Sequence, residues 1–178
     1  ILGNTCTRSC GFCGVKTGRP ETVDWDEPEK VARSIKIMNI KHAVVTSVDR
    51  DDLKDGGSII WIETVKAIRR MNPTTTLETL IPDFQGIERN IDRIVEANPE
   101  VVSHNMETVR RLTREVRIQA KYDRSLEVLR YLKAKGINRT KSGIMLGLGE
   151  TEEEVIQTLH DLRNANVDVV TIGQYLQP

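Results

Sequence analysis

The sequence predicts an α/β fold, a partial (β/α)6 barrel of the TIM type. Short β-rich runs alternate with longer helical patterns along the 178 residues, and this alternation predicts parallel strands joined by right-handed crossovers. The runs Ala43–Val45 and Val169–Ile172 are nearly continuous in apolar residues, which predicts strands buried on both faces. Because six strands are two fewer than a complete barrel contains, a doubly wound sheet is the alternative architecture.

The elements are expected in strict alternation. The expected strands are Ile1–Asn4, His42–Ser47, Thr75–Ile81, Val101–His104, Ser142–Leu146 and Val169–Gly173. The expected helices lie at about Pro28–Asn39, Ile59–Met71, Ile87–Asn98, Thr108–Ile118, Ser125–Lys135 and Glu152–Ala165.

Three of these helices carry clear start or stop residues. Pro28 suits a first helical residue, with Asp26 as its cap. Gly136 follows a lysine-rich last turn, as a helix stop does. Thr151 and Glu154 have the spacing of a capping box.

Composition narrows the function. Lys plus Arg (26) balances Asp plus Glu (26), so the net charge is zero, which argues against a nucleic-acid partner. No apolar run approaches a membrane span and no signal-peptide pattern opens the chain. Clustered cysteines without such a signal favour a reducing compartment, the cytoplasm or the interior of an organelle. Since residue 1 is not Met and both ends fall at expected strands, we expect a core domain, 1–178, truncated at both ends.

The only three cysteines form the motif Cys6-x3-Cys10-x2-Cys13. Three thiolates can hold a cubane iron–sulfur cluster by three of its four irons, whereas such clusters normally have four cysteine ligands. One iron is then open, as at a catalytic metal site. The alternative is structural zinc, which favours four ligands.

Polar residues follow the expected strands at their carboxyl ends, where a barrel builds its active site. An amide and a carboxylate follow the fourth strand as Asn105 and Glu107, and such a pair suits a diol; the alternative is a helix cap. The acidic run Asp49–Asp52 is expected to be a solvated loop. The candidate site residues at strand ends are Thr46, Ser47, Asn105, Glu107, Met145, Gly147 and Gln174.

The cysteine motif, with Phe12 directly before its last cysteine, resembles that of the radical S-adenosylmethionine superfamily. The resemblance implies that the open iron chelates S-adenosylmethionine, whose reductive cleavage gives a 5′-deoxyadenosyl radical. It further implies that Thr46 and Ser47 contact the methionyl end and that Asn105 and Glu107 bind the ribose hydroxyls. No side chain need perform the central step, because the cofactor carries it.

Further cofactor contacts follow from the same resemblance. Arg117 is placed to bind the cofactor carboxylate, with a helix-face salt bridge as the alternative. The turn Met145–Gly147 resembles the superfamily segment near the adenine, and Gln174 completes the expected cofactor-binding set.

Longer strings are similar to the lipoyl synthase family across the whole chain. They are Gly3–Cys13, Val45–Asp52, Glu78–Phe84, His104–Val109, Lys141–Glu150 and Gly173–Pro178. This resemblance implies insertion of sulfur at C6 and C8 of an octanoyl group on a lipoyl carrier domain, either the E2 component of a 2-oxoacid dehydrogenase or glycine cleavage H protein. It also implies an electron donor such as ferredoxin or flavodoxin.

The resemblance sets one limit and leaves two rivals. Lipoyl synthases carry a second [4Fe-4S] cluster as sulfur donor, whose ligands we expect only in the full-length protein. The rival within the class is a biotin-synthase-like or other radical sulfur-inserting enzyme. The rival from another class is a zinc-stabilised binding domain.

Overall fold

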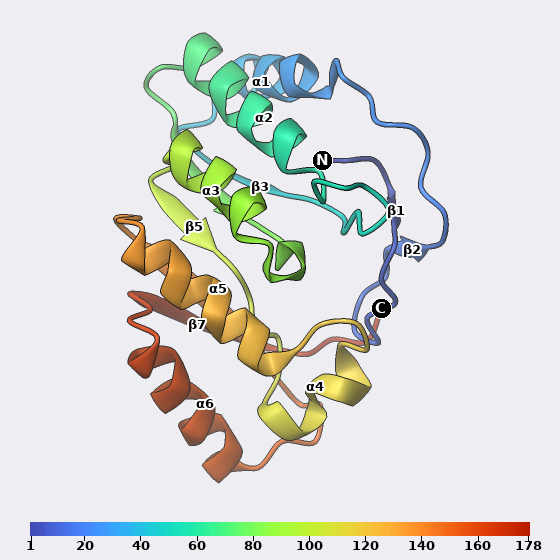
Figure 1. Ribbon diagram of the computed structural model, residues 1–178, viewed down its shortest axis with the longest axis vertical. Coiled ribbons are helices and arrows are strands. Elements are labelled where there is room, and N and C mark those ends of the chain that lie inside the picture. The colour runs from blue at the N-terminus through green and yellow to red at the C-terminus, as the bar shows by residue number, and fades with distance from the viewer.

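The computed structural model describes residues 1–178 and contains a five-stranded parallel sheet of order β3-β4-β5-β6-β7 (Figure 1). Its strands are β3 (His42–Thr46), β4 (Thr76–Leu80), β5 (Val101–Ser103), β6 (Thr140–Leu146) and β7 (Val169–Gln174). A doubly wound sheet reverses its strand order at a switch point. Because this order follows the chain without reversal, the partial barrel is confirmed and the doubly wound alternative is wrong.

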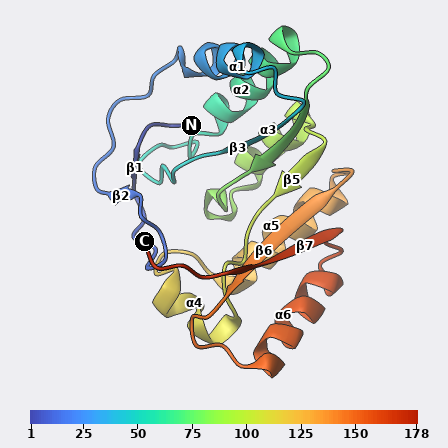
Figure 2. The same ribbon diagram turned by 180° about the vertical axis from the view of Figure 1, so that it is seen from behind.

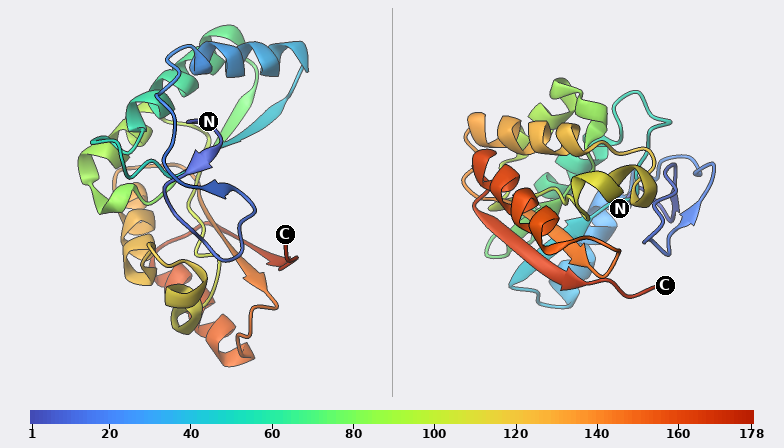
Figure 3. Two further views of the ribbon diagram at one scale, coloured as in Figure 1. Left: turned by 90° about the vertical axis from the view of Figure 1, so that its right-hand side faces the viewer. Right: turned by 90° about the horizontal axis from the view of Figure 1, so that it is seen from below.

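The helices connect successive strands. They are α1 (Glu27–Ile37), α2 (Ser58–Met71), the short 3-10 helix η1 (Phe84–Gly86), α3 (Glu88–Ala97), α4 (Arg110–Val116), α5 (Tyr122–Ala134) and α6 (Glu152–Asn164). Right-handed crossovers in sequential order put such helices on one face of the sheet. The view from behind shows β5 and β6 in front of α3 and α5 (Figure 2). The N-terminal segment and the C-terminus lie on the side away from α3 and α5 (Figure 3).

The first expected strand, Ile1–Asn4, is not a strand, so five strands stand where six were expected. Only Ile1 lies beside β3: its amino group donates to the Thr46 carbonyl at 2.7 Å, and Val48 N–H donates to the Ile1 carbonyl at 3.3 Å. Leu2 and Gly3 then take φ values of 69° and 91°, which end an extended course. Two short strands, β1 (Thr5–Cys6) and β2 (Lys16–Thr17), pair separately in parallel.

Burial on both faces is wrong for the two apolar strands. Ala43 and Val45 are buried, but Val44 between them is 58% exposed and Ile172 is 51% exposed. Both strands are sheet edges, and the helices cover only one face. Apolar continuity therefore did not distinguish an edge strand from a central one.

The two largest apolar clusters fix helices on the sheet. The larger joins α2 and α3 to β4 through Trp61, Ile94 and Leu77. The smaller joins α5 and α6 through Leu129 and Leu162. The larger cluster extends to Ile81 at the carboxyl end of β4, where that residue also lines the site cavity.

The helix ends agree with most of the expected signals. Thr151 and Glu154 make the reciprocal bonds of a capping box, and Gly136 follows α5 with a φ of 89°. Asp26 occupies the N-cap position of α1, but its side chain makes no capping hydrogen bond. No helix has both the length and the apolar character to cross a membrane.

Candidate functional site

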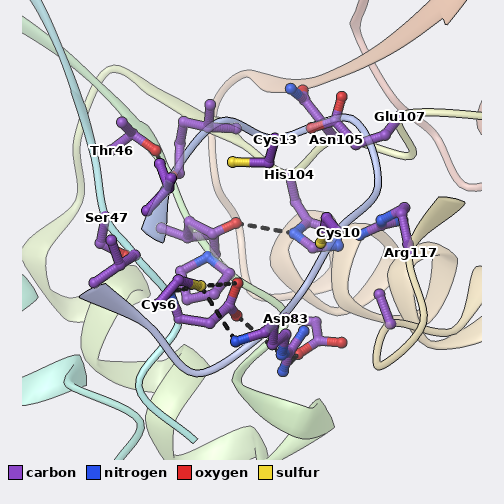
Figure 4. Close-up of a pocket in the computed structure, with 18 of the residues that line it drawn as sticks. Cys6, Cys10, Cys13, Thr46, Ser47, Asp83, His104, Asn105, Glu107 and Arg117 are labelled. Atoms are coloured by element: carbon purple, nitrogen blue, oxygen red, sulfur yellow. Dashed lines mark hydrogen bonds and ion pairs between the residues drawn. The ribbon is translucent and has the colours of Figure 1, made fainter. Parts of the chain in front are cut away.

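A cavity of about 450 Å³ opens at the carboxyl ends of β3, β4 and β5 (Figure 4). It brings together the three cysteines and most of the other expected site residues, although they come from distant parts of the chain. Those that line it are Cys6, Cys10, Cys13, Phe12, Thr46, Ser47, Asn105, Glu107 and Arg117. Residues outside the expected set of metal and cofactor ligands also line it, among them Arg8, Asp49, Asp83 and His104.

Three expected site residues do not line this cavity. Met145 pairs with Gly173 in the β6–β7 ladder, and Gln174 pairs with Leu146. Gly147 has a φ of 106° in the turn after β6. The predicted cofactor contacts of Met145, Gly147 and Gln174 stay predictions.

The cysteine loop is held by main-chain hydrogen bonds. Cys6 Sγ accepts the N–H groups of Arg8 at 3.4 Å and Asp49 at 3.3 Å. Gly11 N–H donates to the Val116 carbonyl at 2.8 Å, which ties the loop to the end of α4. Burial raises the pKa of Cys10 to about 11, although Arg117 opposes the shift. The Cys10 thiol is therefore protonated at neutral pH.

The expectation of a solvated acidic loop at Asp49–Asp52 is wrong. The Arg8 guanidinium contacts both Asp49 and Asp51, while Asp52 pairs with the buried Arg50 at 2.9 Å. Arg8 is also paired with the fully buried Asp83. A buried charge requires a partner, so the buried Arg8 and Arg50 pair with acids of this run; Asp49 and Asp51 are partly buried, and Asp52 stays exposed. The signal available in the sequence was an arginine inside the cysteine motif and a second one inside the acidic run.

Asn105 and Glu107 face the cavity and do not cap a helix. Helix α4 begins at Arg110, two residues later than expected, and its N-cap residue, Val109, makes no side-chain capping bond. Glu107 has a φ of 63°, and this left-handed conformation ends the extended segment that follows β5. Gly143 leaves room for the amide, because a methyl group there would lie 3.0 Å from Asn105 Oδ1. Burial raises the pKa of Glu107, opposed by Arg117.

Arg117 is a buried cation with neutral hydrogen-bond partners. It is 6% exposed and donates from Nη1 to the Met106 carbonyl at 2.9 Å and to Ser125 Oγ at 3.3 Å. It therefore does not form the helix-face salt bridge that was the alternative interpretation. Burial lowers its pKa, and the nearby Glu107 carboxylate opposes that shift.

Ser47 and Thr46 lie at the end of β3. Thr46 Oγ1 donates to the Leu80 carbonyl at 3.2 Å. Ser47 Oγ is buried without a hydrogen-bond partner, which is uncommon for a polar atom in a folded protein. Since Ser47 lines the cavity, a polar ligand atom would satisfy it.

Comparison with known proteins decides the family. The model of the Radical SAM superfamily matches residues 1–162. The chain belongs to the radical SAM superfamily. Among solved structures of similar fold, methylornithine synthase (PylB) has a TM-score of 0.77 at 16% identity, covering 99% of this chain and 52% of that one. The hydrogenase maturase HydG has a TM-score of 0.79 at 15% identity, covering 98% and 41%.

Relatives of much higher identity are lipoyl synthases. That of Flavobacterium johnsoniae is 94% identical over 178 residues, which are all of this chain and 62% of the relative. The mitochondrial lipoyl synthase of Nematostella vectensis is 88% identical over the same residues, 61% of its length. The chain thus spans less than two thirds of the length of these relatives.

The radical SAM family implies an iron–sulfur cluster and S-adenosylmethionine, and the residues present fit both. No three His, Cys, Asp or Glu side chains are placed to hold a single metal ion. A cubane cluster bonds each thiolate to a different iron, so its ligands are spread around one cavity, and Cys6, Cys10 and Cys13 line one cavity together. The orphaned Ser47 hydroxyl and the buried Arg117 suit a ligand that is both polar and anionic.

Proposed function

We propose that this chain is the radical-generating core of a lipoyl synthase. One observation carries the proposal: all three cysteines of the motif line the same cavity as Asn105 and Glu107. The 94% identity to a lipoyl synthase over the full chain supports the choice of reaction. The biotin-synthase-like and zinc-bound alternatives have no comparable support.

In this proposal, Cys6, Cys10 and Cys13 hold the [4Fe-4S] cluster. Burial raises the pKa of Cys6, and the two N–H groups directed at Cys6 Sγ oppose that shift by favouring the thiolate form. When bound, the cluster and S-adenosylmethionine supply the radical that abstracts hydrogen. The protein contributes binding, orientation and exclusion of water.

The cofactor contacts follow from the chemistry of the cavity wall. Glu107 accepts hydrogen bonds from the ribose diol, and Asn105 offers both a donor and an acceptor beside it. Arg117 binds the methionyl carboxylate, since a guanidinium matches a carboxylate in a planar fork. Ser47 donates its free hydroxyl to the methionyl end. Phe12 packs against the bound cofactor from the cysteine loop.

The substrate contacts follow from the apolar part of the same wall. Ile1, Val15, Val48, Leu80 and Ile81 line the cavity beside the cysteines. An octanoyl tail gains about 0.8 kcal/mol per methylene that it buries there. The tail arrives on a lipoyl carrier domain, and a low-potential donor such as ferredoxin or flavodoxin supplies the electron. A dry apolar wall also protects the radical from side reactions.

The test is anaerobic reconstitution of the chain with iron and sulfide, followed by reduction in the presence of S-adenosylmethionine. We expect visible absorption, about four irons per chain, and release of 5′-deoxyadenosine. A Cys13→Ala variant should lose all three. Stoichiometric zinc without colour would overturn the cluster assignment. All three cysteines belong to one motif, so none is left to hold the second cluster that donates sulfur in lipoyl synthases. We therefore expect no lipoyl product from this chain alone.

A further inference from the structure

We propose that Arg8 is a positioning residue for the iron–sulfur cluster: its side chain clamps the cysteine loop to the carboxyl ends of β3 and β4 and so fixes the direction of Cys6. This inference rests on the proposed cluster site.

Acids from two loops engage the guanidinium of Arg8 through Nε and Nη2. Nε donates to Asp51 Oδ2 at 2.7 Å and Nη2 donates to Asp51 Oδ1 at 2.9 Å, a two-pronged contact. Nη2 also donates to Asp83 Oδ1 at 2.6 Å, and Nε lies 3.3 Å from Asp49 Oδ1. Asp49 and Asp51 follow β3, while Asp83 follows β4. Arg8 therefore anchors the cysteine loop to the ends of two neighbouring strands at once.

The same residue fixes the ligand loop through its main chain. Arg8 N–H donates to Cys6 Sγ at 3.4 Å, and the Arg8 carbonyl accepts Thr17 Oγ1 at 3.0 Å. Asp49, one of the acids that contacts the guanidinium, donates its own N–H to the same sulfur at 3.3 Å. A movement of the Arg8 side chain would consequently move both N–H donors that orient Cys6 Sγ. Outer-shell groups of this kind set the geometry of metal ligands.

Burial makes the clamp rigid. The Arg8 side chain is 4% exposed and that of Asp83 is 0% exposed. Loss of one partner from such a buried network leaves an uncompensated charge, so movements that separate Arg8 from Asp83 are disfavoured. Lysine keeps the charge but lacks the planar fork that engages two acids together. Arg8→Lys therefore tests the geometry of the contact while it leaves the positive charge in place.

The chain offers a matched control in Arg124. This arginine pairs with the other oxygen of Asp83 at 3.3 Å, but it comes from α5 and has no bond to the cysteine loop. Arg124→Gln removes a cation from the same buried acid without releasing the loop. A purely structural network would respond similarly to either loss.

The experiment compares the wild-type chain with Arg8→Lys, Arg8→Gln, Asp51→Asn and Arg124→Gln after anaerobic reconstitution. The readouts are iron loss to a chelator, the electron paramagnetic resonance spectrum of the reduced cluster with and without S-adenosylmethionine, and the melting temperature of the apo chain. We expect Arg8→Lys and Asp51→Asn to lose iron about tenfold faster and to show an altered spectrum. We expect Arg124→Gln to match the wild type in iron retention and spectrum.

The outcomes separate the possible failures. Should Arg8→Gln not fold, Arg8→Lys and Asp51→Asn decide the question. Wild-type iron retention and an unchanged spectrum in both, even with a lower melting temperature, would overturn the positioning role. Equal effects in Arg124→Gln would overturn it as well, by showing general destabilisation. If the wild-type chain itself binds no cluster, the proposed function fails instead.

Discussion

Replacing Gly143 by alanine tests whether the position of Asn105 controls cofactor binding. A methyl group at Gly143 would lie 3.0 Å from Asn105 Oδ1, 3.0 Å from Thr171 Oγ1 and 3.2 Å from Asn105 Cγ. These contacts require the two side chains to retreat by a few tenths of an ångström. Overpacking of this size costs about 1 kcal/mol of folding stability. A misaligned amide forfeits about 1 kcal/mol of hydrogen bonding, which weakens S-adenosylmethionine binding about fivefold.

The assay is anaerobic calorimetric titration of the reconstituted chain with S-adenosylmethionine, beside thermal unfolding of the apo chain. Gly173→Ala is the matched control, because Gly173 lies in the adjacent strand and an added methyl group there meets nothing within 4 Å. The control should bind the cofactor as the wild type does. Unchanged affinity in Gly143→Ala, despite a lower melting temperature, would refute the reasoning that Asn105 contacts the cofactor.

Three further predictions address single groups. Ser47→Ala removes a buried hydroxyl that has no partner, so the apo chain should be no less stable while cofactor affinity falls about fivefold; a lower melting temperature with unchanged affinity contradicts this. Burial lowers the pKa of His104 from 6.5 to about 4, so the folded chain keeps it neutral. The stability that neutral His104 confers is fully present above pH 6.5. It is lost as pH falls towards 4, at about 1.4 kcal/mol of unfolding free energy per pH unit. The unfolding free energy of His104→Gln, measured in urea, should therefore fall less steeply with pH across this window. Thr151→Ala removes a capping box and should cost about 1 kcal/mol in urea unfolding, with iron content unchanged; a loss of iron contradicts a purely local role.

Some of the site was predictable because its signals are local. The three cysteines fall within one short motif, and Asn105 and Glu107 directly follow a strand. The prediction that this pair caps a helix was wrong. The backbone turns at Glu107, whose φ is 63°, and the helix begins only at Arg110. The sequence does not specify which of these two local outcomes is adopted.

The role of Arg8 was not predictable, because its partners lie far away in the chain. Asp51 and Asp83 are 43 and 75 residues from it. An acidic run such as Asp49–Asp52 is ordinarily solvated, since charged side chains are almost never buried unless paired. Only the approach of the cysteine loop to the ends of β3 and β4 supplies those pairs.

The sequence by itself determined the alternation of strands and helices, the capping box at Thr151 and the cysteine motif, since each depends on residues within a few positions of one another. The tertiary structure decided the strand order, the open face beside Val44 and the single cavity shared by Cys6 and Glu107. These features depend on contacts between segments that are far apart in the sequence, and such contacts form only when the chain folds.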